Sequence, residues 1–264
     1  MAQHRTPGSI VVGIDGSKAA VTAAAWALDE AVSRDLPLRL VHVIGAGDDD
    51  YDPETEYAEE SLRAATAAVH ARGKPVKVET DILCGDVDAT LLGESEGAAM
   101  ICVGTVGIGR VASRLLGSTA VALATGAQCP VGVIRDGEAP PDGRVIVVVD
   151  DLPGNDEVVH QAMEEARLRE APLLALGVWR WDFGSMSYDE LDQRMESWRQ
   201  SYPDVHVRLC EAPGGPVEYL DTRTDTVGLV VIGSVDAKLL GRLVGPRAHP
   251  ILDHPSRSVL VVRH

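Results

Sequence analysis

The run Ile10-Val-Val-Gly-Ile-Asp15 returns later in the chain as Arg144-Val-Ile-Val-Val-Val-Asp150, and Asp150 stands 135 positions after Asp15. Apolar runs of this kind, each ended by a polar residue, predict strands that are buried on both faces. The correspondence continues through three further pairs: Leu38–Ile44 with 173–178, Cys84-Gly85 with Pro213-Gly214, and Val131–Ile134 with 259–262. We therefore predict that the chain consists of two copies of one domain.

A short linker is predicted between the two copies. Residues 136–143, Asp-Gly-Glu-Ala-Pro-Pro-Asp-Gly, have the proline and glycine content that is typical of a connection. We place the N-terminal domain at residues 1–135, the linker at 136–143 and the C-terminal domain at 144–264. A chain of 264 residues is long enough to bury two cores of this size.

Helical patterns alternate with the strands. Two apolar stripes at helical spacing follow the first two strands: Ala20, Ala24, Ala27 and Ala31, then Ala58, Leu62, Ala65 and Val69. Strands near residues 76–84 and 99–104, a helix from about Ser118 and the strand Val131–Ile134 complete a βαββαβαβ-like order. This alternation predicts an α/β fold class with two tandem, doubly wound, parallel-sheet domains of Rossmann-like type. Ligands of such sheets bind beyond the carboxyl ends of the strands.

Charge and hydropathy narrow the classes of partner. The formal net charge of −16 argues against nucleic acid and against an anionic membrane, because both would repel the chain. No stretch approaches the roughly eighteen apolar residues of a membrane-spanning helix, and no signal-like segment opens the sequence. The four cysteines are scattered without the spacing of a zinc or redox site. We expect a cytoplasmic protein without a metal centre of its own.

A glycine-rich stretch carries the strongest functional signal. A strand-like run ends at Gly104, Gly107 follows, and Gly117 returns after nine residues, directly before Ser118 and Thr119. Glycines let backbone N–H groups approach an anion, and a helix that begins at Ser118 would favour negative charge at its N-terminus. The stretch therefore predicts a phosphate-binding site, to which the two hydroxyl groups could add donors.

The spacing Gly104-x2-Gly107-x9-Gly117-Ser118 resembles the phosphate loop of the universal stress protein family, and the resemblance in its tandem two-domain, actinobacterial form covers nearly the whole chain. It implies an adenine nucleotide alpha hydrolase-like fold that binds ATP, with magnesium as an optional companion, through Gly104, Gly107, Gly117, Ser118 and Thr119. It also implies that Asp15 contacts the ribose or adenine side and that Val43, in Leu40-Val-His-Val43, contacts adenine.

Simpler roles exist for the residues at the nucleoside end. Asp15 could cap the helix that begins near Ser17 or Lys18. Val43 closes a strand, where valine is usually part of the core. His42 alternates with Val43 along the strand, so we expect it to be packed on the opposite face or partly exposed, without a catalytic role.

The second copy differs from the first at the phosphate loop. Gly233 matches Gly104, but Asp236 stands where Gly107 does, and Pro246 follows Gly245 where Ser118 follows Gly117. An aspartate would repel phosphate, and a proline removes both an N–H donor and the hydroxyl. We therefore expect one competent nucleotide site per chain, in residues 1–135.

The resemblance implies a nucleotide-dependent regulator of stress response or dormancy that acts by association with a regulatory protein partner. We do not expect an enzyme, since the residue before Ser118 is Gly117 and not the lysine of a phosphoryl-transfer loop, although slow ATP hydrolysis stays open. Two alternatives remain: a scaffold of the same fold that binds no nucleotide, and an NAD- or flavin-linked oxidoreductase. The second is disfavoured because the strand after Gly107-Ile-Gly109-Arg-Val-Ala112 ends at Arg135 instead of an acidic residue.

The duplication also suggests how the two domains associate. Single-domain relatives pair through their last strands, so Val131–Ile134 and residues 259–262 would pair within one chain and protect two open edges. The sequence does not decide whether whole chains form a homodimer.

Overall fold

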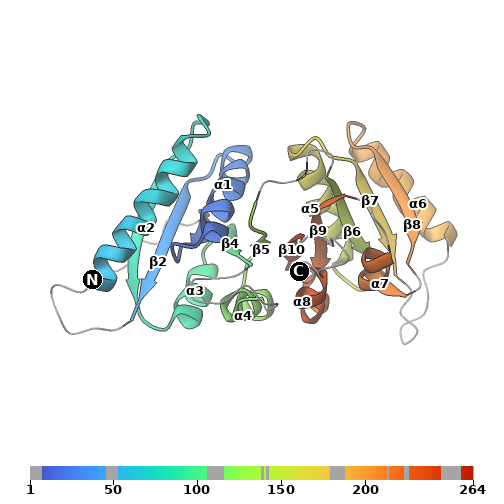
Figure 1. The fold of residues 1–264 in the computed structure, drawn as a ribbon. Helices are drawn as coiled ribbons and strands as arrows, with labels where there is room; N and C mark the ends of the chain where they lie inside the picture. Colours follow the sequence, from blue (N-terminus) through green and yellow to red (C-terminus); the bar gives the residue numbers. More distant parts are fainter. Residues whose placement is uncertain are drawn as a thin grey trace. The chain divides into compact units, whose positions relative to one another are not determined.

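The structure is a computed structural model whose helices and strands fall into two compact units, Met1–Glu138 and Ala139–His264 (Figure 1). It describes the following parts of the chain: residues 8–45, 53–105, 116–137, 140, 143–178, 188–212, 214–222, 226–244 and 257–263. Each unit is an α/β fold with a parallel sheet, which confirms the predicted fold class.

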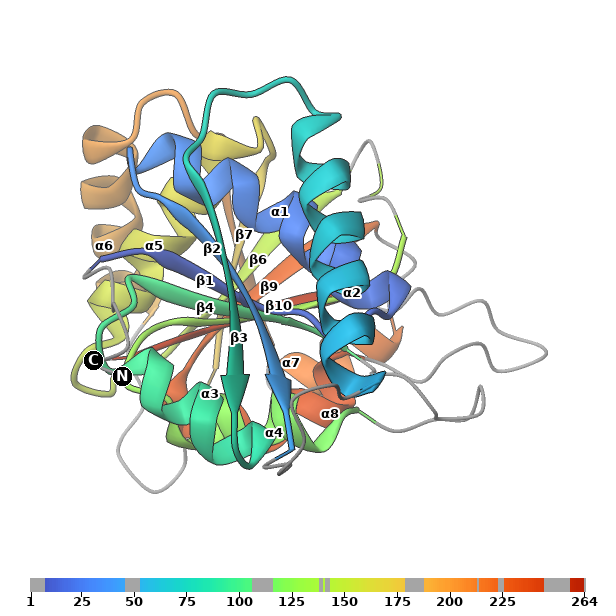
Figure 2. The same ribbon diagram turned by 90° about the vertical axis from the view of Figure 1, so that its left-hand side faces the viewer.

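The first unit alternates strands and helices from β1 to β5. Its elements are β1 (Ile10–Gly13), α1 (Lys18–Ser33), β2 (Leu38–Ile44), α2 (Pro53–His70), β3 (Val78–Cys84), α3 (Val87–Ser95), β4 (Met100–Gly104), α4 (Ser118–Gly126) and β5 (Val131–Ile134). The strand order is β3-β2-β1-β4-β5, and every pair is parallel. Helices α1 and α2 contact each other on one face of the sheet, and α3 and α4 contact each other on the other face (Figure 2).

The second unit repeats this plan, and two short helical segments follow its fourth strand. Its elements are β6 (Arg144–Val149), α5 (Asn155–Leu168), β7 (Leu173–Gly177), α6 (Tyr188–Ser201), β8 (Val207–Glu211), α7 (Gly215–Thr222), β9 (Val227–Gly233), the 3-10 helix η1 (Ser234–Leu239), α8 (Leu240–Leu243) and β10 (Ser258–Val262). The strand order within the unit is β10-β9-β6-β7-β8, again parallel.

Small and apolar side chains bring the first unit's helices onto its sheet. All eight residues of the two predicted helical stripes are buried: Ala20, Ala24, Ala27, Ala31, Ala58, Leu62, Ala65 and Val69. Alanine allows a helix axis to lie close to the strands beneath it. An added Cβ at Gly104 would lie 2.7 Å from the Cβ of Ala19 and 2.9 Å from the backbone nitrogen of Ala20. The end of β4 therefore touches the first turn of α1.

Helix α3 was missing from the predicted order. The observed order of the first unit is βαβαβαβαβ, so the βαββαβαβ-like prediction was wrong at this element. The reason is that α3 has nine residues and buries only Leu91, Glu94 and Ser95, which leaves no apolar stripe to detect. Its N-terminus is instead set by Asp86, whose side chain accepts a hydrogen bond of 2.9 Å from the N–H of Ala89.

Candidate functional site

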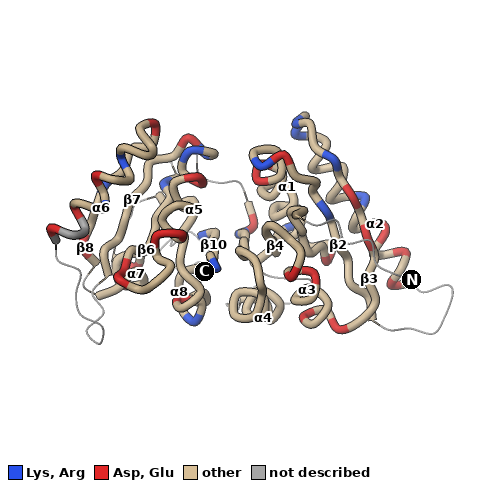
Figure 3. Tube along the Cα trace, turned by 180° about the vertical axis from the view of Figure 1, so that it is seen from behind, with Lys and Arg blue, Asp and Glu red and all other residues tan. Residues whose placement is uncertain are grey.

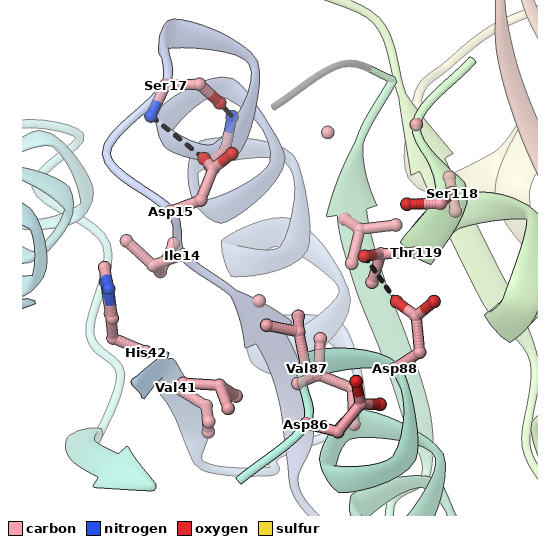
Figure 4. A pocket seen from close by; sticks show the side chains of 18 residues that line it. Ile14, Asp15, Ser17, Val41, His42, Asp86, Val87, Asp88, Ser118 and Thr119 are labelled. Carbon is pink, nitrogen blue, oxygen red and sulfur yellow. Dashed lines mark hydrogen bonds between the residues drawn. The ribbon is translucent and has the colours of Figure 1, made fainter. Parts of the chain in front are cut away.

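A cavity of about 460 Å³ lies in the first unit at the carboxyl ends of β1, β2 and β4 (Figure 4). The N-termini of α3 and α4 form its other side. This is the point where the strand order reverses around β1, because β2 continues the sheet on one side of β1 and β4 on the other. A cavity of this volume is of the size that binds small molecules, and its place is the usual ligand position of a doubly wound sheet.

Asp15 enters the cavity from the turn between β1 and α1. Its Oδ1 accepts a hydrogen bond of 2.9 Å from the N–H of Ser17, and Ser17 Oγ accepts one of 3.1 Å from the N–H of Ala20. Ser17 is therefore the N-cap of α1, and the alternative that Asp15 caps this helix was wrong. Asp150 makes the matching bond to the N–H of Leu152 at 3.0 Å in the second unit, so this turn belongs to the repeat.

His42 and Val43 come from the end of β2. Val43 is half-buried and lines the cavity. His42 is 7% exposed, and its ring meets that of Tyr57 edge to face, with 5.9 Å between the ring centroids. The Tyr57 hydroxyl donates to the backbone carbonyl of Asp15 at 3.2 Å. His42 is thus packed, as expected, but it lines the cavity together with Val43, so the expectation that it lies away from the site on the opposite face was wrong: both residues stand at the end of β2, which borders the cavity. Burial lowers the pKa of His42 below 6.5, although the carboxylates of Asp15 and Glu54 oppose that shift.

Gly117 and Ser118 present the open end of α4 to the cavity. Gly117 is the N-cap of this helix and donates its own N–H to the carbonyl of Thr105 at 2.9 Å. Within the described residues, no side chain caps α4. The N–H groups in the first turn of a helix have no acceptor inside that helix, so those of α4 are available to an anion. Gly104 also lines the cavity, whereas Gly107 lies outside the described residues.

Thr119 lies at the same edge of the cavity, with its hydroxyl already engaged. Its Oγ1 donates a hydrogen bond of 2.6 Å to Oδ1 of Asp88 on α3 (Figure 4). Sequence reasoning gave Thr119 a role toward phosphate but assigned none to Asp88. It also missed Asp86 and Val87, which line the cavity from the same turn. The pair Gly85-Asp86 was the available signal, because glycine followed by an N-cap residue is typical of a strand-to-helix turn.

The described lining is acidic. Asp15, Asp86 and Asp88 contribute three carboxylates, and the described lining residues include no Lys or Arg. Figure 3 shows further acidic residues on the helices of both units, including α2 and α3. Among the described lining residues, the groups that can donate hydrogen bonds to an anion are therefore mainly backbone N–H groups and hydroxyls.

The segment after the fourth strand of the second unit is helical. After Gly233 the chain forms η1 and then α8, and Asp236 is 5% exposed inside this helical segment. A segment in helical conformation uses N–H groups within its own turns, which leaves fewer for a ligand. Gly245 and Pro246 lie outside the described part of the chain.

The fold and the cavity define a doubly wound α/β protein with a cavity at its topological switch point. Comparison with known proteins gives the family: residues 8–135 match the model of the universal stress protein family. Universal stress protein Rv2624c of Mycobacterium tuberculosis is 47% identical over 98% of this chain and 97% of its own length. Universal stress protein Rv3134c of the same organism is 41% identical over 90% and 92%. The chain belongs to the universal stress protein family, as its sequence pattern predicted.

A solved structure agrees with this assignment at the level of the fold. A universal stress protein from Archaeoglobus fulgidus superposes with a TM-score of 0.70 at 17% identity, covering 97% of this chain and 96% of that one.

Among the helices that the structure describes, each is too short or too polar to span a lipid bilayer.

Proposed function

We propose that this protein binds ATP in the cavity of its first unit and acts in the cytoplasm as a nucleotide-dependent regulator of stress response or dormancy. The proposal is carried by one observation: the N-terminus of α4, which no described side chain caps, opens at Gly117 and Ser118 into a cavity of about 460 Å³. The N–H groups at a helix N-terminus form a favourable binding site for phosphate, and such a site does not need a basic side chain.

The nucleoside end of the proposed ligand lies toward Asp15 and Val43. A carboxylate is a poor neighbour for phosphate but accepts hydrogen bonds from ribose hydroxyls or from an adenine amine. Asp15 already accepts the N–H of Ser17, and a carboxylate can accept several hydrogen bonds at once. Val43 adds an apolar contact for the base. The polarity of the cavity thus supports one orientation, with the base near β2 and the phosphates near α4.

We propose binding without rapid turnover. Phosphoryl transfer of the P-loop kind needs a lysine directly before the serine or threonine of the loop, and Gly117 occupies that position here. The bound nucleotide would then serve as a signal that changes association with a regulatory protein partner. Pairing of the two domains through their last strands belongs to the same proposal.

The nucleotide carried by the protein as it leaves the cell distinguishes the function classes. The full chain is purified rapidly without added nucleotide, denatured, and its small molecules are identified by absorbance at 260 nm and mass spectrometry. ATP or ADP supports the proposal, and NAD or a flavin supports an oxidoreductase. If nothing is retained and calorimetric titration with ATP also shows no heat, the protein is a scaffold that binds no nucleotide.

A further inference from the structure

One hydrogen bond joins the two helix N-termini that border the cavity. Thr119, the second residue of α4, donates to Asp88, the second residue of α3, with 2.6 Å between the oxygen atoms. Figure 4 shows this bond at the edge of the cavity next to Ser118. Asp88 is half-buried, so its carboxylate is only partly screened by water. A fixed negative charge therefore stands one hydrogen bond away from the helix end proposed to receive phosphate.

The negative charge of Asp88 affects which ligands can bind at the N-terminus of α4. A carboxylate near the N-terminus of α4 is stabilised by the same N–H groups that would hold a phosphate, so the two anions compete for one positive helix end. Asp86, in the same turn, adds a second carboxylate to the lining, and the described lining holds no Lys or Arg against them. The phosphate groups of a nucleotide without a metal ion would be repelled by these two carboxylates.

We propose that Asp88 makes phosphate binding at this site depend on a divalent cation that enters together with the nucleotide. The inference rests on the proposed function and names a specificity residue for it. Magnesium is commonly held in proteins by one or two carboxylates together with the phosphates of a nucleotide. The cation would lie between the phosphates and Asp88, and it converts a repulsive contact into an attractive one.

Thr119 is then a positioning residue. Its hydroxyl donates to the Asp88 carboxylate and holds that charge toward α4, which differs from the direct phosphate contact predicted for it. A serine at position 119 keeps this donor, whereas a valine of nearly the same shape loses it. The two substitutions therefore separate the hydrogen bond from the volume of the side chain.

Isothermal titration calorimetry of the full chain tests the proposal with ATP in EDTA, ATP with magnesium, and adenosine. We expect wild type to bind the magnesium complex at least about tenfold more tightly than metal-free ATP, a scale set by one nearby charge pair. Asp88→Asn should reduce this ratio below about threefold, mainly by tighter binding of metal-free ATP. Adenosine, which has no phosphate, should bind wild type and Asp88→Asn equally.

Asp86→Asn is the matched control. It removes one charge from the same turn and keeps an amide that also caps helices. Because the Asp86 side chain is bonded to its own helix α3, the ratio of the two ATP affinities should fall less than it does in Asp88→Asn. Thr119→Val should lower the ratio of the affinity for magnesium–ATP to that for metal-free ATP, and Thr119→Ser should keep this ratio near that of wild type. Equal affinity of wild type for both forms of ATP would overturn the inference; Arg110 and Arg114, which lie outside the described residues, would then be the candidates to neutralise the phosphates. An equal effect of Asp86→Asn and Asp88→Asn would also overturn it. If wild type binds neither adenosine nor ATP, the proposed function itself fails.

Discussion

Gly104 and Gly117 look alike in the sequence, but the structure gives them different surroundings. At Gly104, an added Cβ would meet the backbone of α1 at less than 3.0 Å. At Gly117, the nearest atom of the described residues to an added Cβ is the carbonyl oxygen of Thr105, 3.7 Å away, which is an ordinary contact. Packing alone therefore requires glycine at position 104, whereas the described neighbours of position 117 leave room for a side chain.

These surroundings predict opposite results for the same substitution. Gly104→Ala should destabilise the protein by about 1–3 kcal/mol, because the methyl group forces β4 and α1 apart. Gly117→Ala should change stability by less than about 1 kcal/mol. Urea unfolding followed by circular dichroism measures both, and similar losses for the two variants would contradict the distinction.

An acidic residue at position 117 separates stability from binding. Gly117→Asp supplies the side-chain cap that α4 lacks within the described residues, so stability should stay unchanged or rise by about 0.5–1 kcal/mol. The same carboxylate would occupy the proposed phosphate seat, so ATP affinity should fall by at least about tenfold. Gly117→Asn is the neutral control of the same shape. If calorimetry shows that both variants bind ATP like wild type, the phosphates do not lie at this helix end.

At the scale of elements, a helix or strand could be predicted from the sequence where its buried residues are apolar and regularly spaced. Strands and the helices α1 and α2 were predictable because their buried residues are apolar and periodic. Helix α3 was not, because its buried positions include Glu94, which is 4% exposed and pairs with the guanidinium of Arg39 on β2. A helix anchored by an ion pair has no hydrophobic period to detect.

The candidate site was predictable only in part for a similar reason. Asp15, Val43, Gly104, Gly117, Ser118 and Thr119 do line one cavity, as their places at strand and helix ends suggested. The bond from Thr119 to Asp88 spans 31 positions and joins two helices, one of which had not been predicted. Contacts of this kind depend on tertiary structure and leave no local pattern.

The packing of β2 against α2 predicts a pH dependence of stability through His42. Burial holds the pKa of His42 below 6.5 in the folded protein, so the unfolded chain binds a proton at a higher pH than the folded protein does. Stability from this residue is complete above about pH 6.5 and decreases as the pH falls from there toward the folded pKa, at up to about 1.4 kcal/mol per pH unit.

Unfolding by urea at several values between pH 5 and pH 7.5 measures this decrease. His42→Gln, which cannot be protonated, should show a smaller decrease over this range than wild type. His70→Gln is the matched control, because it makes the same replacement at an exposed position at the end of α2. A pH dependence that is the same in all three proteins would exclude His42 as its source.

For the whole molecule, the two units keep the same framework and differ in sequence at the end where the ligand is proposed to bind. Helix α1 buries Glu30 against Arg34, and α5 buries Glu165 against Arg169 at the matching positions. The turn at Asp15 is likewise repeated at Asp150. The sequence of the segment after the fourth strand has not been kept, since Asp236 stands where Gly107 does, and in the second unit η1 and α8 follow Gly233 and place Asp236 in the interior. Duplication has thus preserved the fold, while the sequence at the proposed phosphate site has diverged.

This divergence predicts one nucleotide per chain. Calorimetric titration of the full chain with ATP and magnesium should give a stoichiometry near one, because a buried aspartate and a helical segment offer the second unit few donors for phosphate. Gly117→Asp should then remove all measurable binding, whereas Asp236→Asn should leave the stoichiometry at one, since neutralising one carboxylate does not open a helical segment. A stoichiometry near two in wild type, with Gly117→Asp removing only half of it, would show that the second unit binds through groups other than a phosphate loop.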